Sequence, residues 1–166
     1  GSTHARFASF FPSKESFLNY LSGTSPRVLG HNPLGAVSVF ALLFVLGVQV
    51  FTGLFVDDEI AFQGPLSKYV PNAVVSFLSE IHEGNQVVIY TLLTIHIAAI
   101  WYYKKFKGED LIRPMFSGDK EIDPSEEANY LPSDLGHASN DGALQRGIAL
   151  ALLSLIAVVV GYLITK

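Results

Sequence analysis

The amino-acid sequence predicts an all-α membrane protein with three transmembrane helices, and three observations support this fold class. Charged residues make up only 16% of the 166 residues, whereas soluble domains average about 25%. The mean hydropathy of the chain is +0.36. Three long runs, residues 28–56, 84–103 and 147–165, contain no Asp, Glu, Lys or Arg. Each run is long enough for a helix that crosses the hydrocarbon core, which needs about 20 mainly apolar residues.

The three uncharged runs have apolar cores at residues 37–46, 87–100 and 148–163. Backbone groups in lipid must be hydrogen-bonded within their own segment, so spans of this kind are expected to be helical. A large soluble helical core is the alternative interpretation, but three such runs leave little polar surface for it. A signal peptide does not explain the first run, because that run lies too far from residue 1.

The residues outside the spans are expected to form short interfacial helices and solvated loops. Phe7–Leu21 carries apolar residues at roughly helical spacing, which is typical of one short interfacial helix. Asn32 and Pro33 are suited to cap and to begin the first span. Residues 72–81 have a helical pattern and can run directly into the second span. Glu109–Gly142 is rich in acids, Pro, Ser and Asn, and is expected to be a solvated loop.

The distribution of basic residues predicts how the chain is oriented in the membrane. Residues 1–30 carry three Lys or Arg residues and residues 104–146 carry six, whereas loop 56–83 carries only Lys68. The N-terminus and loop 104–146 are therefore expected in the cytoplasm. Loop 56–83 is expected in the periplasm, with the chain in a bacterial inner membrane.

Charge and cysteine content exclude several classes of function. The formal net charge is −4, so the chain lacks the basic surface that binds nucleic acid. The sequence contains no cysteine. Disulfides, thiolate metal sites, iron–sulfur clusters and the covalent attachment of c-type haem are all excluded.

Two histidines on the second span are the most informative polar residues. His82 and His96 are 14 positions apart, so their side chains point to nearly the same side of one helix and are separated by about 21 Å along its axis. Neutral imidazole is a common ligand of haem iron. That spacing allows two haems to stack along the helix, one in each leaflet. It is too long for an acid–base pair or a mononuclear metal site.

The spacing of the histidines alone leaves other interpretations of them open. Two six-coordinate haems need four axial ligands, so their remaining ligands must come from another chain or from further helices. His82 and His96 could instead form ordinary interhelical hydrogen bonds, act as a relay in a transporter, or belong to a haemless membrane anchor. His31, at the entrance of the first span, could bind a haem propionate or a quinone headgroup, or help to cap the helix. His4 and His137 lie in polar segments.

Several motifs resemble the prokaryotic cytochrome b561 family, which includes the b-type cytochrome subunit of nickel–iron hydrogenases. The similarity covers residues 1 to about 120, and the segment around the His-Asn-Pro-Leu-Gly motif is its most specific element. The motifs are Ala5-Arg6-Phe7, Gly30-His31-Asn32-Pro33-Leu34-Gly35-Ala36, Thr52-Gly53-Leu54-Phe55, Ile81-His82-Glu83 with His96 downstream, and Glu109–Gly118.

The resemblance implies a bundle of four core helices that holds two b haems. It implies that His82 and His96 each ligate one haem iron, and that His31, Asn32 and Arg6 contact the cofactors. The other two axial ligands would come from the family's first and second helices, which this sequence lacks. Such proteins pass electrons between a periplasmic partner (a hydrogenase or a cytochrome c) and membrane quinone.

The resemblance also suggests how the chain is divided. Residues 1–120 would be the C-terminal half of a dihaem cytochrome b domain. Residues 121–142 would be a polar cytoplasmic loop, and residues 143–166 an additional transmembrane helix.

Overall fold

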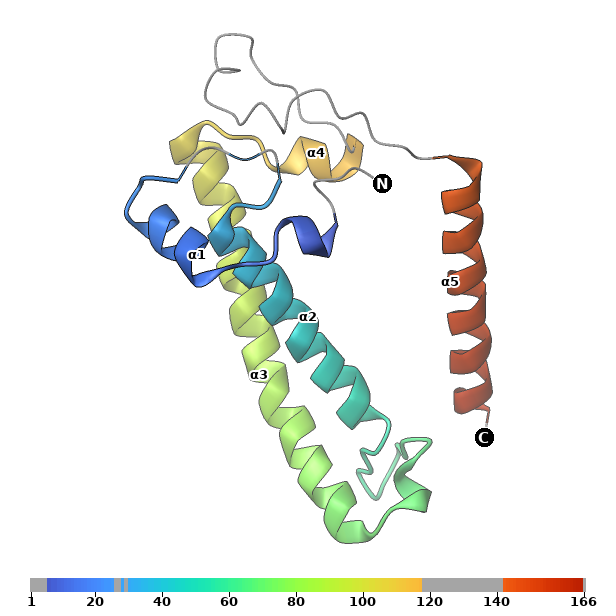
Figure 1. Ribbon diagram of the computed structural model, residues 1–166. Helices are drawn as coiled ribbons and strands as arrows, with labels where there is room; N and C mark the ends of the chain where they lie inside the picture. Colours follow the sequence, from blue (N-terminus) through green and yellow to red (C-terminus); the bar gives the residue numbers. More distant parts are fainter. Residues whose placement is uncertain (1–5, 26–27, 29, 118–141, 166) are drawn as a thin grey trace. The chain divides into compact units, whose positions relative to one another are not determined.

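A computed structural model describes residues 6–25, 28, 30–117 and 142–165. Within these residues the regular structure is helical, with one isolated β-bridge between Asp57 and Gln63. Three helices are long and apolar enough to cross a membrane (Figure 1). They are α2 (Pro33–Gly53), α3 (Asn72–Tyr102) and α5 (Ala143–Ile164). The prediction of an all-α chain with three candidate membrane spans is confirmed.

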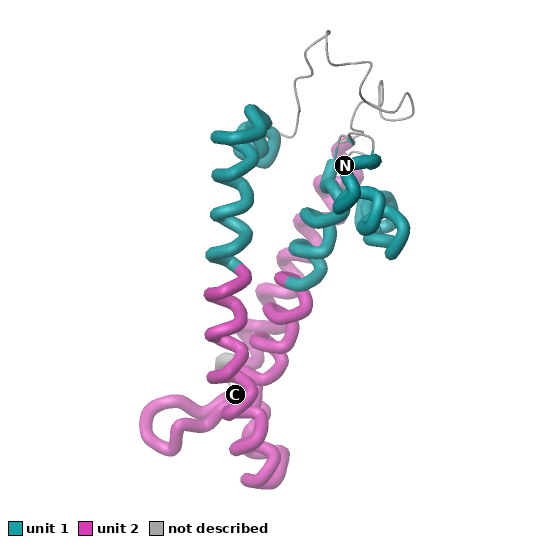
Figure 2. Tube along the Cα trace, turned by 90° about the vertical axis from the view of Figure 1, so that its left-hand side faces the viewer, with its two compact units in different colours: residues 1–41, 93–140 teal, residues 42–92, 141–166 magenta. Residues whose placement is uncertain are grey.

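The chain divides into two compact units, which Figure 2 distinguishes by colour. Unit 1 comprises residues 1–41 and 93–140, and unit 2 comprises residues 42–92 and 141–166. Helices α2 and α3 each contribute one part to each unit.

The N-terminal segment of unit 1 forms two short helices, so the prediction of one helix over Phe7–Leu21 is wrong. A 3-10 turn, η2, covers Phe7–Ser9, and α1 covers Lys14–Leu21. A capping box separates them. The Ser13 hydroxyl accepts a hydrogen bond from the Ser16 amide at 3.0 Å, and the Ser16 hydroxyl accepts one from the Ser13 amide at 3.1 Å. These reciprocal bonds begin a new helix at residue 14.

Aromatic rings attach this N-terminal segment to the first turns of α2. Phe7, Phe10 and Phe11 surround the ring of Phe40, with centroid distances of 5.8, 5.8 and 5.3 Å. Offset and edge-to-face pairs at such distances add stability beyond the burial of their area. The packing places the segment before α1 beside the entrance of α2.

The start of α2 follows the predicted capping pattern. Asn32 Oδ1 accepts a hydrogen bond from the Gly35 amide at 2.7 Å, directly before Pro33, the first helical residue. The other end of the Asn32 amide donates to the Tyr103 hydroxyl at 3.1 Å. That hydroxyl is also hydrogen-bonded to the Tyr20 hydroxyl. Burial, followed by the bond to Tyr103, raises the pKa of Tyr20 well above its ordinary value.

Helix α3 ends in a π-helical turn, η4, over Tyr103–Lys107. Gly108 follows with φ +68°, a left-handed conformation that only glycine adopts at little cost. A six-residue helix, α4 (Ile112–Ser117), comes next, so the expectation of a loop throughout Glu109–Gly142 is wrong for this part. Residues 118–141 of the expected loop lie outside the described residues.

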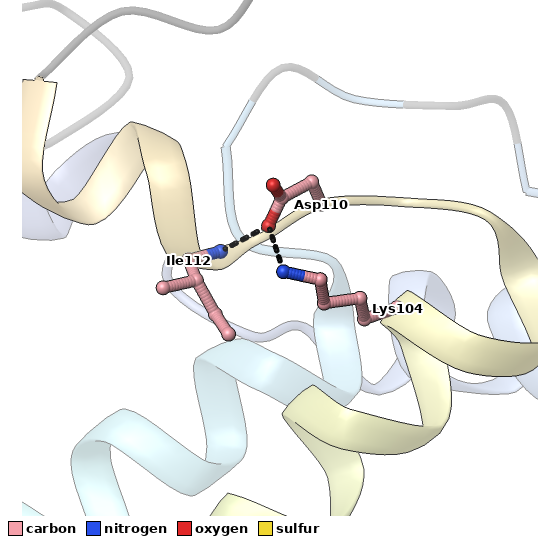
Figure 3. A network of polar contacts seen from close by, with 3 residues as sticks. All are labelled: Lys104, Asp110 and Ile112. Atoms are coloured by element: carbon pink, nitrogen blue, oxygen red, sulfur yellow. Dashed lines mark hydrogen bonds and ion pairs between the residues drawn. The ribbon is translucent and has the colours of Figure 1, made fainter.

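The side chain of Asp110 accounts for the start of α4. One carboxylate oxygen accepts a hydrogen bond from the Ile112 amide at 3.0 Å and lies 3.7 Å from Lys104 Nζ (Figure 3). The hydrogen bond from the Ile112 amide is the main cause that lowers the pKa of the Asp110 carboxyl. Smaller effects, which include the positive charge of Lys104, also lower it. A negatively charged acceptor before the first helical turn stabilises that turn.

In unit 2, α3 begins at Asn72, so residues 72–81 run directly into the second span as predicted. The connection between α2 and α3 is therefore residues 54–71, shorter than the expected loop 56–83. Backbone hydrogen bonds hold it, including Leu66 N–H to Leu54 O at 2.9 Å. Within it, Asp58 Oδ1 accepts bonds from three successive backbone amides, which lowers the pKa of this carboxyl. These amides belong to Ile60, Ala61 and Phe62.

Few side chains are buried in the part of the chain that the structure describes. Ala36 and Val45 on α2 are the buried hydrophobic residues, and Thr52 and Ser67 are the buried polar ones. On α5, every described side chain from residue 143 to residue 162 is exposed. Extensive exposed apolar surface is expected of helices whose surroundings are lipid or further helices.

Candidate functional site

The two predicted ligands, His82 and His96, lie on α3 on its less exposed face. The half-buried positions of this part of the helix recur every three or four residues, which is the period of one helical face. Those positions are His82, Asn85, Ile89, Leu92 and His96. Each histidine contacts a polar side chain of α2 within its own unit.

In unit 2, both ring nitrogens of His82 have partners on α2. Nδ1 lies 3.0 Å from Thr52 Oγ1, and Nε2 lies 2.9 Å from Gln49 Nε2. Thr52 is only 2% exposed. A Cβ atom on Gly53 would lie 3.0 Å from Cε1 of the ring, so glycine permits this close approach.

A second amide extends these contacts along the helix pair. Asn85 Nδ2 donates to Gln49 Oε1 at 2.7 Å and to the Val45 carbonyl at 2.9 Å. Asn85, Gln49, His82 and Thr52 thus form a continuous set of hydrogen-bonded side chains, called here the His82 network. It lies within the apolar spans, where an unsatisfied polar group is costly.

In unit 1, the environment of His96 is simpler. Nδ1 lies 3.0 Å from the Ser38 hydroxyl on α2. No residue that the structure describes is hydrogen-bonded to Nε2 of this ring. A neutral imidazole whose Nδ1 is held by a hydroxyl can present Nε2 to a metal, the arrangement in which second partners orient a histidine ligand.

The residues expected to contact cofactors behave differently from one another. The His31 ring packs against Phe10 with centroids 4.7 Å apart. Both polar ends of the Asn32 amide are used in the cap and in the bond to Tyr103. Arg6 is exposed before η2. His31 and His96 both belong to unit 1.

His4 and His137, the remaining histidines, lie outside the described residues. Among the described residues, no hydrogen bond or ion pair joins Arg6 to His31 or His96. The cofactor role expected of Arg6 stays a prediction.

Four residues of the two sites were missed by the reasoning from sequence. They are uncharged polar residues on apolar spans: Ser38, Gln49, Thr52 and Asn85. Such residues usually hydrogen-bond across helices, and this tendency is the signal that could have identified them. Gln49 and Thr52 are three residues apart and so share a helix face.

Comparison with known proteins gives one match. Residues 2–118 match the family model described as prokaryotic cytochrome b561. No curated protein and no solved structure matches the chain. The matched residues make up more than half of the sequence and include both His82 and His96. This chain therefore belongs to the prokaryotic cytochrome b561 family.

Proposed function

We propose that this chain helps to carry two b-type haems and passes electrons between a periplasmic redox partner and the quinone pool. Membership of the cytochrome b561 family implies a membrane haem b electron-transfer subunit. One observation carries the finer proposal. Two imidazoles on one membrane-spanning helix each have Nδ1 hydrogen-bonded to a hydroxyl of α2.

In this proposal, His82 and His96 each provide one axial ligand to a haem iron. The remaining axial ligands come from helices that are not in this sequence or from a second chain. Each haem, when bound, supplies an iron that gains and loses one electron. The role of this chain's own residues is to hold the two imidazoles about 21 Å apart along α3, so that an electron crosses the membrane in two steps.

The surroundings of His82 and His96 are compatible with axial ligation of haem iron by these two residues. Nε2 of His96 has no hydrogen-bond partner among the described residues, so a metal can reach this atom without displacing one of them. Nε2 of His82 is contacted by the Gln49 amide, which must rotate away before a metal binds. Gly53 leaves space for the ring beside the end of α2. The neutral form of imidazole is a common ligand of haem iron.

The cofactor contacts extend to three residues near the cytoplasmic end. His31 hydrogen-bonds a haem propionate or a quinone headgroup, supported by its position directly before the first turn of α2, in the same unit as His96. Asn32 acts by positioning, because both ends of its amide are already bonded within unit 1. Arg6 provides a positive charge for a propionate.

We base the proposed division of the chain on its similarity to the cytochrome b561 family, and its orientation on the distribution of basic residues. Residues 1–120 form the C-terminal half of a dihaem cytochrome b domain, residues 121–142 a polar cytoplasmic loop and residues 143–166 an additional span. The N-terminus and loop 104–146 are cytoplasmic, and the α2–α3 connection is periplasmic. The periplasmic partner is a hydrogenase or a cytochrome c.

Counting haem in the native membrane complex tests the proposal. The wild-type complex is expected to contain two haems per copy of this chain, measured by the pyridine haemochrome method. His82→Ala and His96→Ala are each expected to lose one haem, because each removes one axial ligand. His137→Ala, a matched replacement of a histidine in a polar segment, is expected to keep both.

Two results would overturn the proposal. One is full haem content in both the His82→Ala and His96→Ala complexes. The other is an assembled native complex without haem, which would support a haemless membrane anchor.

A further inference from the structure

The Thr52 hydroxyl has a single proton, and its surroundings show where that proton lies. Thr52 Oγ1 is 2.7 Å from the Val48 carbonyl oxygen, which can only accept a hydrogen bond. The hydroxyl proton is therefore directed at that carbonyl. His82 Nδ1, 3.0 Å from the same oxygen, must then be the donor. The Thr52 end of the His82 network thus requires a proton on Nδ1 of His82.

The opposite end of the network leads independently to the same tautomer. Asn85 Nδ2 contacts the Val45 carbonyl, so this atom of Asn85 is the donor. It also contacts Gln49 Oε1, which leaves Gln49 Nε2 facing the His82 ring. An amide NH2 group can only donate, so Nε2 of His82 must carry the lone pair.

We propose that α2 selects the Nδ1–H tautomer of His82, and that Gln49 occupies the metal-binding lone pair of this ring until a metal displaces it. Thr52 and Gln49 are then positioning residues. The identity of the metal as haem iron rests on the proposed function, whereas the tautomer does not. Free histidine adopts the Nδ1–H tautomer less often than the Nε2–H tautomer. In this site α2 stabilises the Nδ1–H tautomer, which leaves the lone pair of Nε2 as the atom that can bind a metal.

The described residues around His96 do not select one tautomer of its ring. Its Nδ1 contacts the Ser38 hydroxyl, for which the described residues provide no backbone acceptor. The Ser38 proton can point to the ring or away from it, so either tautomer is compatible with this contact. His96 therefore serves as an internal reference for any measurement made on His82.

Simple interhelical association is the competing explanation of the His82 network. If that were its only role, loss of Thr52 or of Gln49 would weaken the helix pair and shift haem affinity in the same direction. Tautomer selection predicts opposite effects. Loss of the Thr52 hydroxyl impairs presentation of Nε2, whereas loss of the Gln49 amide removes a competitor for it.

The first experiment measures the tautomer without any metal. The full chain, labelled with 15N at histidine, is studied by NMR in detergent micelles at a pH of about 8.5, where ordinary imidazoles are neutral. His82 is expected to show a protonated Nδ1 and an unprotonated Nε2. Thr52→Val is expected to weaken this preference, because the Gln49 amide still donates to Nε2. The double variant Thr52→Val/Gln49→Leu is expected to abolish it, and Thr52→Ser to retain it.

Thr91→Val is the matched control for this experiment. The exposed Thr91 hydroxyl makes the same type of bond to a carbonyl four residues earlier, at 2.9 Å, but contacts no histidine. It is expected to leave the His82 spectrum unchanged. A protonated Nε2 in the wild type, or an unchanged preference in the Thr52→Val/Gln49→Leu double variant, would overturn the inference.

The second experiment titrates the His96→Ala chain with iron protoporphyrin IX and imidazole, which supplies the second axial ligand. Thr52→Val is expected to lower the affinity by about 10- to 100-fold, as is common for loss of a second partner of a histidine ligand. Gln49→Leu is expected to raise it, and the exposed control Gln86→Leu to leave it unchanged. Lower affinity in Gln49→Leu would overturn the role of Gln49.

The two experiments separate this inference from the proposed function. An Nδ1–H tautomer with no porphyrin binding in any variant would support tautomer selection and contradict haem ligation by His82. Porphyrin binding with an Nε2–H tautomer in the metal-free chain would support haem ligation by His82 and contradict tautomer selection.

Discussion

The environments of His82 and His96 differ in how completely the protein determines each ring. His82 lies in a network of four side chains that ends at backbone carbonyls of α2 on both sides. His96 has one hydroxyl partner. In a medium of low polarity, a fully connected network is strong, but loss of one member leaves others unsatisfied. Substitutions near His82 should therefore cost more than comparable ones near His96.

The difference arises from the local sequence of α2. Gln49 and Thr52 place two polar side chains on one face within a single turn, and Asn85 follows His82 by one turn on α3. Near Ser38, the neighbouring residues of α2 are small or apolar. The same pair of helices thus provides a polar cluster at one histidine and a single contact at the other.

The largest effect is expected from Asn85→Ala, which removes the bonds to Gln49 and to the Val45 carbonyl. The loss should be about 1–2 kcal/mol, at the upper end for interhelical hydrogen bonds in membranes. Ser38→Ala removes one bond and should cost about 0.6 kcal/mol, the average for such bonds. Reversible unfolding of the full chain in mixed micelles measures both. Equal losses in the two variants would contradict the comparison.

The next effect concerns the glycine beside the His82 ring. Glycine-to-alanine changes within a helix are normally stabilising by about 0.5–1 kcal/mol. Gly47→Ala should show this gain, because nothing lies within 4 Å of the added Cβ. Gly53→Ala places a Cβ 3.0 Å from Cε1 of His82, so the ring must shift and the variant should lose about 1 kcal/mol.

Thermal unfolding of the two glycine variants, together with the His82 15N spectrum, measures this effect. A Gly53→Ala protein that is stabilised as much as Gly47→Ala, with an unchanged His82 spectrum, would show that the ring is not confined there.

The spans could be predicted from sequence because they depend on properties of single segments. Uncharged runs identified α2, α3 and α5, and the Asn32–Pro33 cap identified where α2 begins. Each of these features depends on residues close together in the chain. The same applies to the helical pattern of residues 72–81, which lengthens α3 before its uncharged part.

The parts that could not be predicted depend on competition or on contacts between distant residues. Phe7–Leu21 has one apolar pattern, but the Ser13 capping box divides it. The composition of the segment after α3 indicated a loop, whereas the bond from the Ile112 amide to Asp110 begins a short helix there. The His82 network joins residues 30 or more positions apart, so no local pattern reveals it.

The smallest expected effect compares two carboxylates, one in each unit. Asp58 in unit 2 accepts bonds from three backbone amides. Asp110 in unit 1 accepts one from Ile112, with a weaker contribution from the Arg113 amide, and lies beside Lys104. These bonds lower the pKa of both carboxyls. Each carboxylate therefore stabilises its segment above the ordinary carboxyl pKa of about 3.9, and this stability is lost as the pH falls through the lowered value.

Amide hydrogen exchange between about pH 6 and about pH 2, corrected for the intrinsic rate at each pH, measures this loss. Protection of the Ile60, Ala61 and Phe62 amides should fall on acidification more than that of Ile112, because three bonds depend on the Asp58 charge, whereas Asp110 relies chiefly on the bond from Ile112. Asp58→Asn keeps an acceptor oxygen but cannot titrate, so its loop should lose the pH dependence. Protection that is independent of pH in the wild type would show that charge does not order this connection.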